Sequence, residues 1–141
     1  DVVAGKNKIT GCFIDYSPAG DQFHPMIEYF GEEVSRYDWI KKRELPDWAK
    51  RIFSDHMVAA GNVQKEDELL QIFEISCKTL DHYLSAVSET NNTATNTTEA
   101  QNYYCDNQKQ NPHKPRVMAS LGLNEDDVKA FIQDCLFPEI A

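Results

Sequence analysis

The chain begins with a carboxylate that could donate a proton. Asp1 precedes Val2 and Val3, which are typical of a strand, and successive side chains of a strand point to opposite faces. If Asp1 faces a covered cavity, burial raises its pKa and the group could deliver a proton near neutral pH. The residue pattern alone favours the alternative, a solvated terminal carboxylate.

The segment 43–55 places cations and aromatic side chains around a proline. Pro46 holds Leu45 in an extended conformation, so Trp48 follows a shaped connection. The guanidinium of Arg43 suits bidentate binding of a carboxylate, and Trp48 suits either a pocket wall or the core. Five cations near this turn could bind ligand carboxylates or an acidic protein, or could form a solvated helix end: Lys41, Lys42, Arg43, Lys50 and Arg51.

A third polar group lies in the segment 104–116, which includes Gln108 and Asn111. Its amides stand beside His113, Lys114 and Arg116 and next to two prolines. This combination would suit a corner that contacts a ligand. An exposed helix end is the simpler alternative.

Composition argues against several classes of protein. The formal charge of -9 disfavours a general nucleic-acid binder, because phosphate binding needs a basic surface. No Cys-x-x-Cys pair occurs among the four cysteines, and His24 and His56 lack metal-ligand spacing, so no metal site is expected. No phosphate loop, nucleophile elbow or dinucleotide fingerprint is present, and no apolar run is long enough to predict membrane insertion.

The first half of the chain predicts strands and one helix. β-branched and aromatic residues on both sides of a turn predict a hairpin over 2–16. Apolar residues at spacings of three and four predict a helix over 22–40, weakened at Gly31 and followed by Lys41–Arg43 in its last turn, where the helix dipole favours cations. The apolar run 52–60 stops at Gly61 and predicts a central strand.

The second half predicts helices. The longest runs over 65–87, and its buried stripe would be Leu69, Phe73, Cys77, Leu80, Leu84 and Val87. The Asn- and Thr-rich segment 88–100 predicts a flexible polar insertion. Further helices are expected over 101–110, over 115–121 with Gly122 as cap, and from Asn124, where Asp127 would complete a capping box. The inner face of the last helix would carry Val128, Phe131, Ile132, Cys135 and Leu136. This order of elements predicts an α/β sandwich with a mainly antiparallel sheet.

Three segments, in this order, carry a resemblance to a known family. Residues 1–18 form a hairpin pattern in which an aspartate precedes a glycine turn and the second strand ends in Asp-x-Ser-Pro. Residues 43–48 read Arg-Glu-Leu-Pro-Asp-Trp and are followed by Ile-Phe-Ser-Asp at 52–55. The third segment comprises 104–111, 116–117 and 134–138. Together they resemble the ferredoxin-dependent bilin reductases, most of all the phycocyanobilin:ferredoxin oxidoreductase branch, over nearly the whole chain except 88–100.

The resemblance implies a three-layer α/β/α sandwich around a central, mainly antiparallel sheet. Residues 1–141 would be the C-terminal part of a single domain whose N-terminal strands lie outside this chain. Biliverdin would sit between the sheet and the C-terminal helices, with no bound cofactor. Reduced ferredoxin would supply electrons and the protein would supply protons, to form a phytobilin of the phycocyanobilin type. The resemblance further implies a monomer in the plastid stroma of a eukaryote, or in the cytoplasm if the gene is cyanobacterial or phage-encoded.

The resemblance also assigns roles to single residues. Asp1 matches the proton-donating aspartate of the family's sheet, Arg43 an arginine that pairs with a bilin propionate, and Trp48 a tryptophan at the pocket. Gln108 and Asn111 match helix amides near the substrate. His113 or Lys114 would take the place of a propionate-binding lysine. The cations within 41–51 would form part of the ferredoxin contact.

One departure from the family pattern concerns a second aspartate. Its place falls on Asn111 or Pro112, and neither can donate a carboxylic proton. The protein could therefore carry out a single two-electron reduction, or the second proton could reach the bilin by another route. A catalytically impaired bilin-binding protein of the same fold is the alternative function, and an unrelated small α/β interaction domain is a third.

Overall fold

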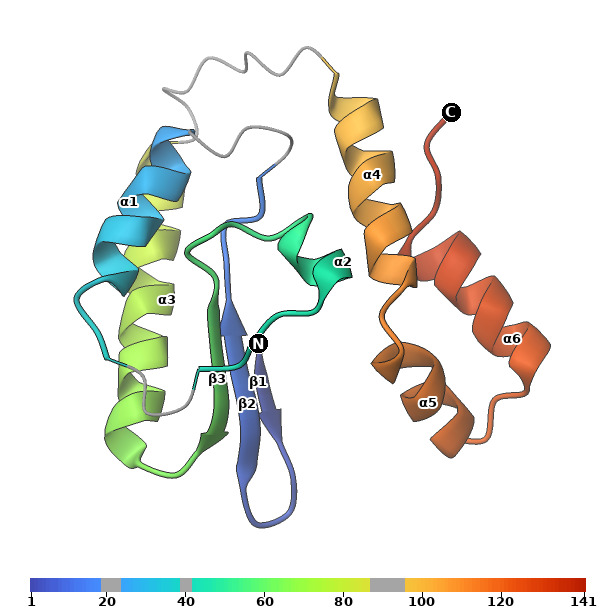
Figure 1. Cartoon of the computed structure of the whole chain (residues 1–141), viewed down its shortest axis with the longest axis horizontal. Coiled ribbons are helices and arrows are strands. Elements are labelled where there is room, and N and C mark those ends of the chain that lie inside the picture. The colour runs from blue at the N-terminus through green and yellow to red at the C-terminus, as the bar shows by residue number, and fades with distance from the viewer. Residues whose placement is uncertain (19–23, 39–41, 87–95) are drawn as a thin grey trace. The chain divides into compact units, whose positions relative to one another are not determined.

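The computed structural model describes residues 1–18, 24–38, 42–86 and 96–141, and it contains both helices and a sheet (Figure 1). The chain divides into two compact units. The first, here called the sheet unit, comprises Asp1–Leu45 and Phe53–Thr93. The second, the helical unit, comprises Pro46–Ile52 and Ala94–Ala141. The predicted mixture of helix with antiparallel strands is confirmed.

The sheet consists of β1 (Val2–Ala4), β2 (Ile9–Ile14) and β3 (Val58–Val63), antiparallel in the order β1-β2-β3. The predicted hairpin is confirmed, and its turn is closed by a hydrogen bond from Gly5 N–H to the carbonyl of Lys8 at 2.8 Å. The prediction of a central strand over 52–60 was wrong. Among the described strands β3 lies at one end of the order, begins at Val58 and continues through Gly61.

The later start of β3 has a cause in the preceding turn. The carboxylate of Asp15 accepts hydrogen bonds from the backbone N–H of Ser54, at 3.0 Å, and from the Ser54 hydroxyl. Ser17 donates a further hydroxyl hydrogen bond to the same carboxylate at 3.1 Å. Because Ser54 is held at the end of β2 in this way, the residues before Val58 form a turn.

Helices α1 (Pro25–Val34) and α3 (Glu66–Ala86) cover one face of the sheet (Figure 1). The ring of Tyr16 stacks on Phe30 with centroids 5.4 Å apart, and its hydroxyl donates to the carbonyl of Thr79. The core cluster between helices and sheet comprises Cys12, Phe30, Val58, Ala60, Val63, Ile72 and Ile75. Gly31 does not break α1; a Cβ there would lie 2.7 Å from the ring of His56.

The predicted helix over 22–40 is shorter than expected. It begins at Pro25, where His24 Nδ1 accepts the N–H of Met26 at 3.2 Å, and it ends at Val34. Residues 19–23 and 39–41 lie outside the described residues. The prediction that Lys42 and Arg43 occupy a last helical turn was wrong. Lys42 forms a β-bridge with Ala60, and Arg43 N–H donates to the carbonyl of Ala59 at 2.7 Å, so this segment runs along β3.

The long helix α3 is confirmed, but its buried stripe differs from the predicted one. Ile72, Ile75 and Thr79 are buried, whereas Phe73, Leu80 and Leu84 are 67%, 55% and 62% exposed. Cys77 is also exposed, Leu69 packs on the core only in part, and Val87 lies outside the described residues. The helix carries two apolar stripes, and periodicity alone does not say which of them meets the sheet.

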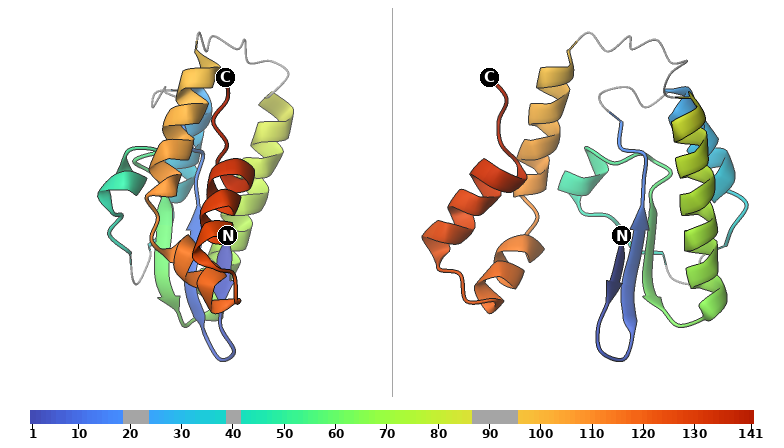
Figure 2. Two further views of the ribbon diagram at one scale, coloured as in Figure 1. Left: turned by 90° about the vertical axis from the view of Figure 1, so that its right-hand side faces the viewer. Right: turned by 180° about the vertical axis from the view of Figure 1, so that it is seen from behind.

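The helical unit contains α2 (Asp47–Lys50), α4 (Thr97–Lys109), α5 (His113–Ser120), α6 (Glu125–Ala130) and a π-helical turn, η1 (Phe131–Leu136) (Figure 2). The predicted cap at Asn124 is confirmed, because its side chain accepts the N–H of Asp127 at 2.9 Å. Gly122, with φ of 95°, ends the preceding helix as predicted. Along α6 and η1, Val128 and Ile132 are buried, but Phe131, Cys135 and Leu136 are exposed.

The predicted polar insertion over 88–100 was wrong in its last part. Thr97–Ala100 form the first turn of α4, and the Asn96 side chain caps it by accepting the N–H of Glu99 at 3.2 Å. Residues 88–95 lie outside the described residues. Helix α5 likewise begins at His113, before Pro115, because proline is tolerated in the first turn of a helix.

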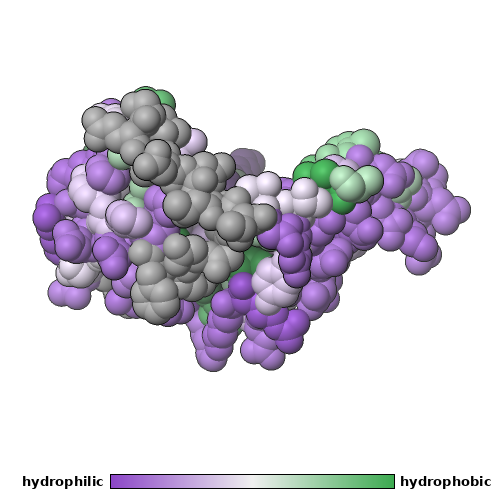
Figure 3. Space-filling view, turned by 90° about the horizontal axis from the view of Figure 1, so that it is seen from above, coloured by the Kyte–Doolittle hydropathy of each residue, from purple (hydrophilic) through white to green (hydrophobic). Residues whose placement is uncertain are grey.

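The surface in view from above is mostly hydrophilic (Figure 3). Within the described part of the chain, no helix is both long and apolar enough to cross a membrane.

Candidate functional site

The candidate site in the sheet unit is the sheet face that α1 and α3 leave uncovered. Cys12 of β2 and its partner Ala60 of β3 point into the core. The neighbouring residues along each strand point the other way, because side chains alternate. They form two pairs in register, Gly11 with Gly61 and Phe13 with Ala59. We call this surface, together with Val3 opposite Gly11, the glycine face.

Asp1 belongs to the glycine face. Its N–H group donates to the carbonyl of Phe13 at 2.7 Å, and the N–H of Phe13 donates to the carbonyl of Asp1 at 2.8 Å. Two residues that exchange both bonds stand directly opposite, and their side chains share one face. Asp1 is exposed, so the described residues do not enclose it in a covered cavity.

Arg43 reaches the same face from outside the strands. Its guanidinium donates to the carbonyl of Thr10, and its Cζ lies 5.5 Å from the centroid of the Phe13 ring. A Cβ on Gly61 would lie 2.8 Å from Arg43 Nε and 3.1 Å from its Cγ, and a Cβ on Gly11 would lie 2.8 Å from the Phe13 ring. The two glycines therefore let the arginine and the aromatic ring lie flat against the sheet.

A β-bulge positions the acceptor for Arg43. The register between β1 and β2 shifts after Val3, so Thr10 is left without an opposite residue on β1. Its hydroxyl donates to the carbonyl of Val3 at 3.0 Å, which ties the bulge to β1. The guanidinium of Arg43 binds the carbonyl of this same residue, and because a guanidinium has five N–H groups in total it is still suited to pair with a carboxylate.

A second cluster lies in the helical unit. Lys114 Nζ donates to Gln108 Oε1 at 2.7 Å, and Gln108 Nε2 donates to Tyr104 Oη at 2.9 Å. The ammonium of Lys114 also lies 4.1 Å from the centroid of the Phe137 ring, a cation–π contact. Burial lowers the pKa of Lys114. The cluster thus presents a half-buried cation held by neutral groups.

The other predicted residues of the helical unit occupy different positions. Asn111 Oδ1 accepts the N–H of His113 at 3.0 Å at the start of α5, and the His113 side chain is exposed.

Trp48 is half-buried on α2, which packs against α4. Arg43 and Trp48 are close in sequence, but Arg43 belongs to the sheet unit and Trp48 to the helical unit. The same division separates Lys42 from Lys50 and Arg51; Lys41 lies outside the described residues.

Several residues of these two clusters were not predicted from the sequence. Phe13, Gly11 and Gly61 build the glycine face, and Tyr104 and Phe137 complete the Lys114 cluster. A glycine inside a strand pattern often marks a close approach of another group, and this signal was present at Gly11. The contact of Tyr104 lies within α4, four residues from Gln108. The contact of Phe137 joins Lys114 of α5 to the end of the chain, which no local pattern reveals.

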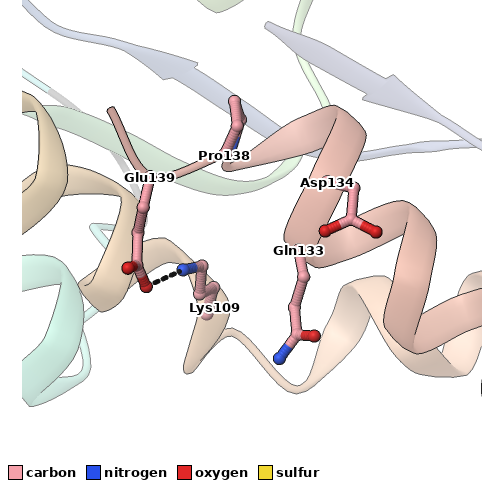
Figure 4. A pocket seen from close by; sticks show the side chains of 5 residues that line it. All are labelled: Lys109, Gln133, Asp134, Pro138 and Glu139. Carbon is pink, nitrogen blue, oxygen red and sulfur yellow. Dashed lines mark hydrogen bonds and ion pairs between the residues drawn. The ribbon is translucent and has the colours of Figure 1, made fainter. Parts of the chain in front are cut away.

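Another hollow lies beside α4 and is lined by Lys109, Gln133, Asp134, Pro138 and Glu139 (Figure 4). Lys109 is paired there with Glu139 at 3.1 Å and with Asp106 at 3.3 Å. Because its single cation is already neutralised by two carboxylates, this hollow does not suit an anionic ligand. Among the described residues, no group of His, Cys, Asp and Glu is arranged to hold a metal ion. No known family model matches the chain.

Proposed function

We propose that this chain is part of a ferredoxin-dependent bilin reductase, which converts biliverdin to a phytobilin of the phycocyanobilin type. One observation carries the proposal. Asp1 and Arg43, the expected proton donor and propionate anchor, are far apart in sequence yet both stand beside Phe13 on the glycine face. Their residue types suit a ligand that is flat, conjugated and carries carboxylates.

In this function the glycine face forms one wall for the bilin. The Phe13 ring, which lies over Gly11, would pack against a conjugated tetrapyrrole. Arg43 would form a charge-assisted pair with a propionate, and its bond to Thr10 would keep it in place. Asp1 would protonate the bilin radical that forms when reduced ferredoxin delivers an electron.

The helical unit would supply the opposite wall, as the third layer of an α/β/α sandwich. Gln108, Trp48 and Asn111 would line it. Lys114, whose positive charge is held by the Gln108 amide and the Phe137 ring, would take the second propionate. His113, exposed and next to Lys114 in sequence, is the weaker choice for this role.

Electron delivery in this proposal requires an acidic ferredoxin to dock nearby. Lys42, Arg43, Lys50 and Arg51 are exposed and would attract it despite the formal charge of -9. The protein would work as a monomer, in the plastid stroma or in a cyanobacterial or phage-infected cytoplasm.

The alternative function is a bilin-binding protein of the same fold that has lost catalysis. It is favoured by the place of the family's second acid, which falls on Asn111 or Pro112. The side-chain oxygen of Asn111 accepts the N–H of His113 at the start of α5. The two functions share the binding face and differ in turnover.

One experiment separates the two functions. The complete gene product is mixed with biliverdin, reduced ferredoxin and a system that regenerates the reductant, and absorbance spectra are recorded over time. We expect the biliverdin band to be replaced by that of a reduced bilin. An unchanged spectrum of bound biliverdin would support the binding protein. No binding at all would contradict both and favour an unrelated interaction domain.

A further inference from the structure

The hydrogen-bonded chain in the helical unit has a fixed direction. An ammonium group can only donate, so the Gln108 amide must turn its oxygen toward Lys114 and its NH2 toward Tyr104. The oxygen of Tyr104 is therefore an acceptor from Gln108. The proton of the Tyr104 hydroxyl must then be donated in another direction.

The hydrogen-bonded series of Lys114, Gln108 and Tyr104 is also partly shielded from solvent, and it carries a positive charge at Lys114. Gln108 is 6% exposed, and Tyr104 and Lys114 are half-buried. Among the described residues no ion pair includes Lys114; its charge is met by an amide oxygen and the face of Phe137. The cation polarises the Gln108 amide and strengthens its N–H bond to Tyr104, the more so if the tyrosine oxygen becomes an anion.

Tyr104 stands on the expected substrate side of α4. Gln108 follows it by four residues, which places both along one side of the helix, and Asn111 lies two residues beyond the helix end at Lys109. The place of the missing second acid falls on Asn111 or Pro112. Of Tyr104, Gln108, Asn111 and Pro112, only Tyr104 has a side chain that can act as an acid, and it lies one helical turn before Gln108.

We propose that Tyr104 donates the second proton of a four-electron bilin reduction, in place of the absent second aspartate. This inference rests on the function proposed above. Asp1 would serve the first two-electron reduction and Tyr104 the second, with Gln108 and Lys114 as positioning residues that stabilise the phenolate.

The second reduction consumes two electrons and two protons. Reduced ferredoxin gives one electron to the two-electron-reduced bilin and forms a radical anion. The O–H bond of Tyr104 breaks as a C–H bond forms on the bilin, leaving a neutral bilin radical and a phenolate. A second electron from reduced ferredoxin and a proton from water complete the product, and another proton from water restores the phenol.

The first test uses adjacent tyrosines as variant and control. Tyr104→Phe keeps the ring and removes the proton, whereas Tyr103→Phe alters a 51% exposed neighbour on the same helix. Products of the complete gene product with biliverdin and reduced ferredoxin are separated chromatographically, and radicals are followed by electron paramagnetic resonance. We expect Tyr104→Phe to bind biliverdin as wild type, to accumulate the two-electron product and a bilin radical, and to slow the second reduction about 100-fold. Tyr103→Phe should match wild type.

The second test reverses the direction of the hydrogen bond between residue 108 and Tyr104 without changing the tyrosine. In Gln108→Glu the carboxylate pairs with Lys114 and can only accept, so the Tyr104 hydroxyl must donate to it. We expect the same accumulated two-electron product as for Tyr104→Phe. Because this variant also neutralises Lys114, the proposed propionate anchor, binding of biliverdin should weaken on either account, and rates are compared at saturating biliverdin. A purely structural role for the pair would instead slow both reductions together.

The outcomes separate this inference from the proposed function. A four-electron product at wild-type rate from Tyr104→Phe, or a wild-type protein that stops at two electrons, contradicts the role of Tyr104 and leaves bilin reduction standing. A wild-type protein that does not reduce biliverdin contradicts both.

Discussion

Arg43 lies over the ring of Phe13, with its guanidinium carbon 5.5 Å from the ring centroid, and both side chains rest on glycines of the sheet. Asp1 stands opposite Phe13 through two backbone hydrogen bonds. One aromatic residue thus has an acid on one side and a fixed cation on the other. This relationship underlies the proposed function.

Arg43→Gln should weaken binding of biliverdin but not of its dimethyl ester. The variant loses a charge-assisted bond to a propionate, which is worth about 1.5–3 kcal/mol, or roughly a 10- to 100-fold rise in Kd. The ester has no carboxylate for Arg43 to bind, so its Kd should stay the same. Spectroscopic titration of both ligands measures the difference. Lys42→Gln is the control because Lys42 is an exposed neighbouring cation; equal losses for acid and ester would refute the pairing.

Gly61→Ala should displace Arg43 and leave the fold intact. The new methyl group would meet Arg43 Nε at 2.8 Å, and a flexible side chain can move away at little cost in stability. We expect a Kd for biliverdin raised about tenfold, the equivalent of about 1.4 kcal/mol, with a change in the free energy of unfolding below about 1 kcal/mol. Gly5→Ala is the control, since its Cβ would make an ordinary contact with the Lys8 carbonyl at 3.6 Å. Wild-type affinity in Gly61→Ala would show that the position of Arg43 does not matter for binding.

The sequence predicted the parts of the fold that depend on local patterns. The hairpin, the long helix at 66–86, the Asn124 cap and the Gly122 helix end all follow from residues close together in the chain. The sequence did not predict the features that depend on contacts between residues far apart in the chain. Asp15 binds Ser54 and delays β3, and the bonds of Arg43 to Thr10 and Ala59 replace an expected helix end.

The candidate site was predictable to a similar degree. Asp1 and Arg43 were named through the resemblance, and the placement of both on one face depends on strand register, which the sequence does not give. Lys114 and Gln108 were named separately, and their bond needs the turn between α4 and α5. Tyr104, which accepts a hydrogen bond from Gln108, has no distinguishing local pattern.

The burial of Asp15 should make stability depend on pH. Burial raises the pKa of Asp15 above its ordinary value of 3.8, so the folded chain binds this proton more tightly than the unfolded chain. The resulting stabilisation is largest at low pH, declines as pH rises from 3.8 through the raised value, and is constant above it.

Urea unfolding across a pH series tests this dependence. The free energy of unfolding of wild type minus that of Asp15→Asn should become more positive as pH falls through the window. The exposed Asp38 provides the control Asp38→Asn, which should follow wild type at every pH. A difference between wild type and Asp15→Asn that does not vary with pH would mean that this carboxyl titrates alike in both states.

The most direct test of the central claim is turnover by Asp1→Asn in the complete gene product. Biliverdin and reduced ferredoxin are supplied, and absorbance and electron paramagnetic resonance are recorded, with Asp55→Asn as an exposed carboxylate control in the same unit. If Asp1 donates the first proton, Asp1→Asn binds biliverdin, accepts one electron and stalls as a bilin radical, while Asp55→Asn turns over as wild type. Wild-type turnover by Asp1→Asn would contradict the account.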